Sequence, residues 1–249
     1  MLRIDHNDPS GGRVNLHRAG RPLVIGHRGA AALAPENTLE SLAAAVDAGV
    51  DLVEFDVGAS LTLGHSEREI PEDAISLDDA LEFLAARGVG AHVDVKHVGI
   101  EPQVVDAIRR HGLAEHAIVS TARSRSVRKL ATLAPDLPRA IGYPYDRHGA
   151  AGVPWPRAVT RQAAAALRAV MPLRLPLLLR ATRANVLALH CALVSPALVV
   201  AAHARDVPVF AWTVNDTALA ERLLAWGVDG IVTDDPGLVS EALARLGAR

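Results

Sequence analysis

Short apolar runs alternate with amphipathic helical patterns from residue 23 almost to the end of this 249-residue chain. Such alternation predicts a parallel sheet whose strands are joined by covering helices. We expect strands at 23–27, 51–56, 61–65, 90–96, 117–121, 139–142, 186–190, 208–213 and 230–233. Helices are expected between most of them, near 39–46, 76–84, 102–111, 124–133, 158–169, 196–205, 216–226 and 237–246.

About eight strand–helix units in a chain of this length favour an α/β fold of the (β/α)8 TIM-barrel type in a single domain. The short strand 61–65 is expected to pair locally with its predecessor. A doubly wound open sheet is the structural alternative, although no glycine-rich dinucleotide-binding turn follows the first strand. Residues 1–20 are polar and are expected to form an N-terminal extension, with the barrel domain at 21–249.

Composition excludes some classes of protein. Half of the residues are hydrophobic, which supports a large core and argues against disorder. The net charge of −2 argues against a general nucleic-acid-binding protein, which would carry a basic excess. We find neither an apolar signal-peptide core nor an apolar run long enough to span a bilayer. With Cys191 as the single cysteine, these features lead us to expect a cytoplasmic protein.

Charged and histidine residues follow the first predicted strands at the points where those strands end. His27 and Arg28 close the first strand, and Glu54 and Asp56 close the second. His65 ends the short third strand. Because the carboxyl ends of parallel barrel strands form one face, we expect these side chains to meet there.

The next strand brings Asp94 and Lys96 to the same rim, on one face because they are two residues apart. Three converging carboxylates repel one another, and a hard divalent cation relieves that repulsion. Arginine and lysine beside such a cation suit a phosphate group. Two histidines suit proton transfer near neutral pH. The combination predicts metal-assisted cleavage of a phosphate ester.

Seven segments from position 26 to position 236 resemble the glycerophosphodiester phosphodiesterase family. They are "GHRG", "PENT", "VEFDV", "LTLGH", "HVDVK", "WTVND" and "GVDGIVTDDP". The resemblance implies a (β/α)8 barrel, a Mg²⁺ or Ca²⁺ ion, and hydrolysis of glycerophosphodiesters to an alcohol and glycerol phosphate. It also implies attack on phosphorus by the substrate's own neighbouring hydroxyl, with one histidine accepting that proton and the other protonating the leaving oxygen.

The resemblance assigns roles residue by residue. His27 and His65 would be the acid/base pair, and the metal ligands would be Glu54, Asp56 and Asp94. Substrate-binding roles would fall to Arg28 and Lys96 at the phosphate, Glu36 as a support of the site or a contact of the glycerol, and Trp212 in the pocket wall.

The chain departs from the family pattern at three places. Ser66 follows the second histidine where the family often has Asp, and Asp94 stands where many members carry Glu. Only "SEREIPEDAI" separates His65 from the next helix, where the family usually inserts a larger cap. A more open rim leaves two alternatives: a lysophospholipase D with peripheral membrane contact, or a barrel that only binds a phosphorylated ligand. The oligomeric state is left open.

Four further interpretations concern other parts of the chain. Asn37 and Glu40 are expected to cap the first helix, and Asp234-Asp235 to cap the turn into the last helix. Pro172 and Pro176 are expected to break any long helix in the apolar and basic segment 171–183. That segment either faces lipid on the catalytic face or is core with a solvated edge. We interpret the histidines outside the motifs, His92, His97, His190 and His203, as structural or surface residues.

Overall fold

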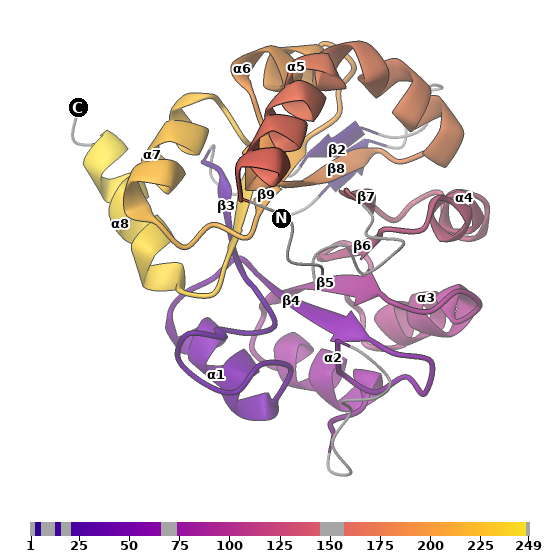
Figure 1. Ribbon diagram of the computed structural model, residues 1–249. Coiled ribbons are helices and arrows are strands. Elements are labelled where there is room, and N and C mark those ends of the chain that lie inside the picture. Colours follow the sequence, from indigo (N-terminus) through magenta and orange to yellow (C-terminus); the bar gives the residue numbers. More distant parts are fainter. Residues whose placement is uncertain (1–2, 6–12, 16–20, 66–73, 145–156, 248–249) are drawn as a thin grey trace.

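The computed structural model describes residues 3–5, 13–15, 21–65, 74–144 and 157–247. Eight parallel strands close into a barrel in the order β10-β3-β4-β5-β6-β7-β8-β9 (Figure 1). The strands are β3 Leu23–Gly26, β4 Leu52–Val57, β5 Gly90–Val95, β6 Ala117–Thr121, β7 Arg139–Tyr143, β8 Val186–His190, β9 Val209–Trp212 and β10 Gly230–Thr233. The predicted (β/α)8 barrel is therefore confirmed.

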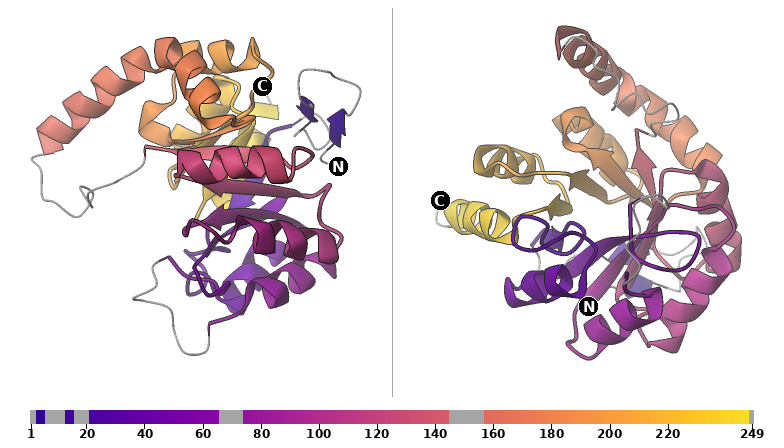
Figure 2. Two further views of the ribbon diagram at one scale, coloured as in Figure 1. Left: turned by 90° about the vertical axis from the view of Figure 1, so that its right-hand side faces the viewer. Right: turned by 60° about the horizontal axis from the view of Figure 1, so that its bottom comes forward.

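Helices surround the barrel and cover the outer face of its sheet (Figures 1 and 2). They are α1 Leu39–Asp47, α2 Leu77–Ala85, α3 Glu101–Arg110, α4 Ser124–Leu133, α5 Arg157–Thr182, α6 Pro196–His203, α7 Thr217–Ala225 and α8 Pro236–Gly247, with a 3₁₀ turn, η2, at Cys191–Leu193. Two short strands, β1 Arg3–Asp5 and β2 Arg13–Asn15, pair as an antiparallel ribbon within the predicted N-terminal extension.

The alternation of side chains along each strand separates two apolar layers. Residues that point out of the sheet pack against the helices in the larger core. Residues that point inward fill the barrel, as Leu52 of β4 does together with Ile25 and Phe210. Two residues further along β4 comes Glu54, and two further Asp56, so the same inward face changes from apolar to acidic towards the catalytic rim.

The strand predicted at 61–65 is absent from the described structure. Leu63 makes only an isolated bridge with Val57, and Thr62 makes another with Ser76. Leu61 has a φ of 59°, in the left-handed region, and this interrupts the extended backbone that a strand needs.

The first helix begins at Leu39, as expected, but its cap lies one residue later than predicted. Its N-cap is Thr38, whose hydroxyl accepts the backbone N–H of Ser41, while the Ser41 hydroxyl lies 3.2 Å from the Thr38 backbone nitrogen. Asn37 is therefore not the cap. It has a φ of 60°, and its side chain turns to the rim of the barrel instead.

The prediction that prolines break the helix in segment 171–183 is wrong. α5 runs without interruption for 26 residues and contains both Pro172 and Pro176. Each proline removes one helical hydrogen bond and costs about 3 kcal/mol. Met171 and Leu175 are fully buried against the barrel, and this packing offsets the loss. The course of α5 is arched in the left view of Figure 2.

Candidate active site

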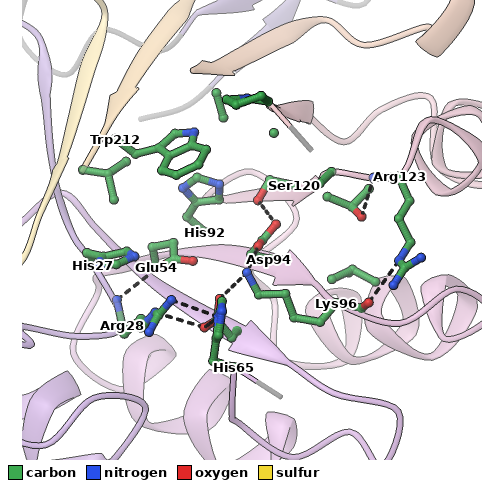
Figure 3. Close-up of a pocket in the computed structure, with 18 residues that line it drawn as sticks. His27, Arg28, Glu54, His65, His92, Asp94, Lys96, Ser120, Arg123 and Trp212 are labelled. Carbon is green, nitrogen blue, oxygen red and sulfur yellow. Dashed lines mark hydrogen bonds and ion pairs between the residues drawn. The ribbon is translucent and has the colours of Figure 1, made fainter. Parts of the chain in front are cut away.

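A pocket of about 420 Å³ lies at the carboxyl ends of the barrel strands. Its size falls within the range of small-molecule sites. Figure 3 shows its lining, to which eight of the predicted site residues contribute: His27, Arg28, Glu54, Asp56, His65, Asp94, Lys96 and Trp212. Glu36 is the one predicted residue outside that lining.

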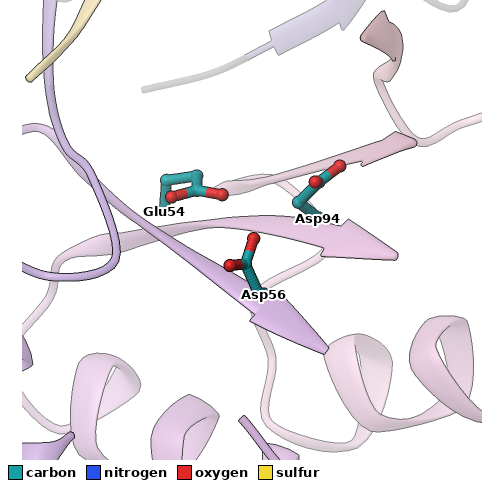
Figure 4. A group of neighbouring side chains, drawn as sticks. All are labelled: Glu54, Asp56 and Asp94. Atoms are coloured by element: carbon teal, nitrogen blue, oxygen red, sulfur yellow. The ribbon is translucent and has the colours of Figure 1, made fainter. Parts of the chain in front are cut away.

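Three carboxylates converge at the floor of this pocket (Figure 4). Glu54 and Asp56 lie two residues apart on β4, and strand register sets Asp94 of β5 directly beside Asp56. One oxygen from each carboxylate lies within 4.8 Å of the others. Ligands at about 2.0–2.6 Å from one cation are separated by about 5 Å at most, so the three can share an ion. The predicted convergence is confirmed.

The buried carboxyl groups of this cluster differ in pKa. Burial, followed by repulsion from Asp56, raises the pKa of Glu54 to about 7. For Asp56 burial acts in the same direction, but a hydrogen bond from His65 and the charges of Lys96 and Arg28 outweigh it and lower the pKa. One carboxyl of the cluster is thus left near its midpoint at neutral pH.

Lys96 sits between two of the carboxylates. Its Nζ lies 2.7 Å from Oδ1 of Asp56 and also pairs with Asp94. Although burial opposes the charged form, these two carboxylates raise the pKa of Lys96. Glu54, Asp56 and Asp94 offer closely spaced oxygen donors, which suit a divalent cation. Neighbouring side chains do not fully stabilise the charge of Glu54, and a bound cation would do so.

Arg28 links the rim to the carboxylates. Its backbone N–H donates to Glu54 Oε2 at 2.8 Å, and its Nε lies 3.1 Å from Oδ2 of Asp56. Its Nη1 is 2.7 Å from both carboxylate oxygens of Glu36. Glu36 thus contacts Arg28, which fits the first of the two roles that the sequence left open, support of the site.

His27 is oriented by a residue that the sequence did not single out for catalysis. Its Nδ1 lies 2.5 Å from Oδ1 of Asp234. Burial opposes protonation of His27, but the hydrogen bond to Asp234 and the charge of Glu54 outweigh it and raise the pKa. With Nδ1 occupied, Nε2 is the nitrogen left for proton exchange with a substrate.

Asp234 is itself held in place. The amide of Asn215 accepts the backbone N–H of Asp234 at 3.0 Å and donates to its carboxylate. The prediction that Asp234-Asp235 caps the turn into the last helix is therefore confirmed for Asp235 and wrong for Asp234. Only Asp235 makes such a contact, accepting the N–H of Gly237. Asn215 belongs to the segment "WTVND" and Asp234 to "GVDGIVTDDP". Membership of these family segments was the sequence feature that could have identified both residues.

His65 stands at the outer edge of the carboxylate cluster. Its side chain is 50 % exposed, and its Nδ1 lies 3.0 Å from Oδ2 of Asp56 and 2.9 Å from Nη2 of Arg28. Nδ1 cannot donate to Asp56 and accept from Arg28 in the same tautomer, so the tautomer of His65 decides which contact is a hydrogen bond. The segment that would carry a cap, including Ser66, lies outside the described residues.

Two more residues form hydrogen bonds with the carboxylate-bearing residues Asp56 and Asp94, and neither was identified from the sequence. The Asn37 side chain accepts the backbone N–H of Asp56 at 3.0 Å and donates to its Oδ2 at 3.4 Å. The Ser120 hydroxyl donates to Oδ1 of Asp94 at 2.7 Å. Asn37 belongs to "PENT", but its sequence position suggested a helix cap.

Trp212 and His92 complete the pocket. Trp212 packs against the apolar interior of the barrel and meets the ring of His190 edge-on at 5.4 Å, so it lines the pocket and also packs. His92 was expected to be structural or on the surface, yet it lines the pocket while 3 % exposed. Burial lowers its pKa to about 4, so its ring is neutral near pH 7.

The segment Met171–Arg183 contributes none of the lining residues in the part of the chain that the structure describes. It forms the second half of α5, which runs along the outside of the barrel towards the start of β8. Among the described residues, this segment therefore adds no apolar wall to the pocket.

Comparisons with known proteins point to one family. The model of the glycerophosphoryl diester phosphodiesterase family matches residues 27–62 and 66–238. A glycerophosphodiester phosphodiesterase from Caldanaerobacter subterraneus subsp. tengcongensis is 26 % identical over 87 % of this chain and 95 % of its own length.

Solved structures share the fold. A phosphodiesterase from Oleispira antarctica, in complex with the product sn-glycerol-3-phosphate, superposes with a TM-score of 0.66 and 20 % identity over 91 % of this chain and 98 % of its own. A glycerophosphodiester phosphodiesterase from Agrobacterium tumefaciens gives the same TM-score and identity over 90 % of this chain and 99 % of its own. With the family model covering most of its length, the chain belongs to the glycerophosphoryl diester phosphodiesterase family.

Proposed function

We propose that this protein hydrolyses glycerophosphodiesters to an alcohol and glycerol phosphate, using a divalent cation. The observation that carries the proposal is the joint presence, in one pocket, of three converging carboxylates and a histidine oriented by an aspartate. Metal ligands alone would fit a binding protein. A histidine whose second nitrogen is fixed by Asp234 is the arrangement that proton transfer needs.

Each side chain has a distinct task in this proposal. The substrate's hydroxyl next to the phosphate attacks phosphorus and passes its proton to one histidine, while the other histidine protonates the leaving alkoxide. The contact of Asp234 with Nδ1 of His27 and that of Asp56 with Nδ1 of His65 support giving these tasks to the two histidines. The cyclic phosphate that results is opened by water with the histidine roles reversed.

Charge stabilisation is divided among the remaining groups. A divalent cation, when bound, supplies positive charge that polarises the phosphoryl oxygens. Arg28 presents a guanidinium that Glu36 and Asp56 hold in one orientation, which suits a phosphate oxygen. Lys96 balances the negative charge of Asp56 and Asp94, and in this proposal it would stand beside the bound phosphate.

Mg²⁺ and Ca²⁺ are the two ions proposed for the site, and Asp94 bears on the choice. Aspartate is one methylene shorter than the glutamate that many family members carry, so its oxygen reaches less far from β5. Ca²⁺ accepts longer bonds, more ligands and less regular geometry than Mg²⁺. Titrating chelator-treated protein with each ion, and following both binding and turnover, decides between them.

The test of the function is a cation-supplemented assay with three substrates: glycerophosphocholine, glycerophosphoethanolamine and lysophosphatidylcholine. We expect turnover of a deacylated substrate that is lost with chelator and restored by Mg²⁺ or Ca²⁺. Lysophosphatidylcholine tests the lysophospholipase D alternative, which has no acyl-binding wall from Met171–Arg183 to support it. Inactivity on all three, with ligand binding retained, would identify a non-catalytic binding barrel instead.

A further inference from the structure

The outward face of α5 is apolar where a surface helix is normally polar. Val170, Leu173 and Leu177 are 41 %, 81 % and 72 % exposed, and they continue a stripe that begins with the exposed Ala163 and Ala166. The spacing of three and four residues sets all five on one side of the helix. The opposite side carries the fully buried residues with which α5 packs on the barrel, including Met171 and Leu175.

The length of α5 separates it from the other helices of the barrel. It has 26 residues and spans about 39 Å, whereas the remaining α-helices have 8 to 12 residues. In the left view of Figure 2, the first half of α5 extends beyond the end of the barrel, on the side away from the β1–β2 ribbon. The helix contacts α4 and α6, and its fully buried residues Met171 and Leu175 lie in its second half. The apolar stripe is therefore continuous from the projecting half to the packed half.

The charges on α5 all have one sign. The helix contains no aspartate or glutamate, although the whole chain carries a net charge of −2. Arg174 and Arg180 are both exposed, and they lie on either side of Leu173 and Leu177 around the helix. Apolar residues flanked by arginines, with no carboxylate among them, are complementary to a surface that is apolar inside and negatively charged outside.

We propose that the outward face of α5 docks on an anionic phospholipid surface, with the leucines entering the acyl boundary and the arginines contacting lipid phosphates. The docking positions the enzyme and is separate from the hydrolysis proposed above.

Two other occupants fit the face less well. The stretch Gln162–Thr182 is long and apolar enough to cross a membrane, with a mean hydropathy of 1.2, contrary to the sequence-based expectation that no run is. Crossing would strip Met171 and Leu175 from the barrel core. A second copy of the chain, pairing through α5, would bring Arg174 and Arg180 close to the same arginines with no carboxylate on the helix to pair them.

The test is co-sedimentation of the full chain with vesicles of phosphatidylcholine alone or mixed with phosphatidylglycerol, in the absence of substrate. We expect binding to the mixed vesicles only, weakening as salt is added. Leu173→Gln/Leu177→Gln and Arg174→Gln/Arg180→Gln should each lower the affinity by about tenfold or more. Leu39→Gln is the matched control, because Leu39 is 41 % exposed on α1, across the barrel from α5.

Gln favours helices and all four positions on α5 are exposed, so the variants should retain wild-type thermal unfolding. They should also retain hydrolysis of a soluble glycerophosphodiester, which separates failure of docking from failure of the proposed activity. The proposal is overturned if wild-type protein does not bind anionic vesicles. It is also overturned if Leu173→Gln/Leu177→Gln binds them as tightly as wild type. A dimer in analytical ultracentrifugation that Leu173→Gln/Leu177→Gln dissociates would assign the face to a second copy.

Discussion

Asp234, at the end of β10, holds Nδ1 of His27, at the end of β3, with their atoms 2.5 Å apart across 207 positions of sequence. The two residues meet because β10 and β3 pair side by side where the barrel closes. An aspartate on one imidazole nitrogen fixes the tautomer and favours the protonated ring.

We expect Asp234→Asn to lower kcat by about 10²–10³-fold, because the ring of His27 loses its fixed tautomer. Since Asp234 raises the pKa of His27, the limb of the pH–rate profile that reports this histidine should move to lower pH. Asp235→Asn is the control: Asp235 only caps Gly237, and asparagine caps about as well. An unshifted profile in Asp234→Asn would mean that another group sets that limb.

Replacing the histidines tests the two proton-transfer roles directly. His27→Ala and His65→Ala should each lower kcat by about 10²–10⁴-fold while the far-ultraviolet circular dichroism stays unchanged. His65 is the more demanding test, because its side chain is half exposed and, among the described residues, contacts Asp56 and Arg28. Near-normal turnover by His65→Ala would remove it from the mechanism and leave a solvent molecule as the proton carrier.

Cation affinity should depend on pH through Glu54. Its pKa of about 7 means that a proton competes with the cation at neutral pH and below. We expect affinity for Ca²⁺ or Mg²⁺, measured by calorimetry, to rise by up to about tenfold per pH unit below 7 and to level off above it. Asp94→Asn should weaken binding at every pH. Affinity that is constant from acid to neutral pH would exclude Glu54 as a ligand.

The same carboxyl predicts how stability of the cation-free protein changes with pH. An unfolded glutamate titrates near 4.5, so between 4.5 and about 7 the folded state binds a proton that the unfolded state has lost. The free energy of unfolding should therefore fall as pH rises through this window, by roughly 3 kcal/mol for Glu54. Urea unfolding with chelator should show this fall in wild type and a smaller one in Glu54→Gln. Equal pH dependence in both proteins would contradict the assignment.

Asn37 should affect cation binding through its side-chain hydrogen bonds and stability through its backbone conformation. Asn37→Gly keeps the left-handed φ of 60° but removes both hydrogen bonds to Asp56. Asn37→Ala removes the same bonds and adds backbone strain, so it should be less stable than Asn37→Gly by about 1 kcal/mol. Both should weaken cation binding to a similar degree. Thermal unfolding and calorimetry measure the two effects separately, and wild-type cation affinity in either variant would show that Asp56 needs no such support.

Much of the site followed from local patterns. The period-2 alternation of a strand puts Glu54 and Asp56 on one face, and the same rule puts Asp94 and Lys96 on one face of the next strand. Once eight strand–helix units imply a parallel barrel, their carboxyl ends must meet at one rim. Convergence of the three carboxylates could thus be predicted without coordinates.

Other features depended on contacts between distant segments. Asn37 and Asp234 both stand where a helix cap is expected, and local pattern supports that interpretation. The barrel decides otherwise, because it brings Asp56 to the side chain of Asn37 and His27 to that of Asp234. Sequence spacing cannot distinguish a cap from a long-range hydrogen bond, since both need the same residue types.

The two prolines of α5 also show that local sequence patterns do not reveal the effect of tertiary packing. Local propensity predicts that Pro172 and Pro176 end a helix, since each removes a hydrogen bond. Burial of Met171 and Leu175 against the barrel stabilises the continuous helix, and this stabilisation exists only once the barrel has formed. The sequence by itself determined the barrel and the carboxylate cluster, because both follow from short-range periodicity. The tertiary structure decided the partner of His27, the role of Asn37 and the outward apolar face of α5, because each depends on what the folded barrel brings together or leaves uncovered.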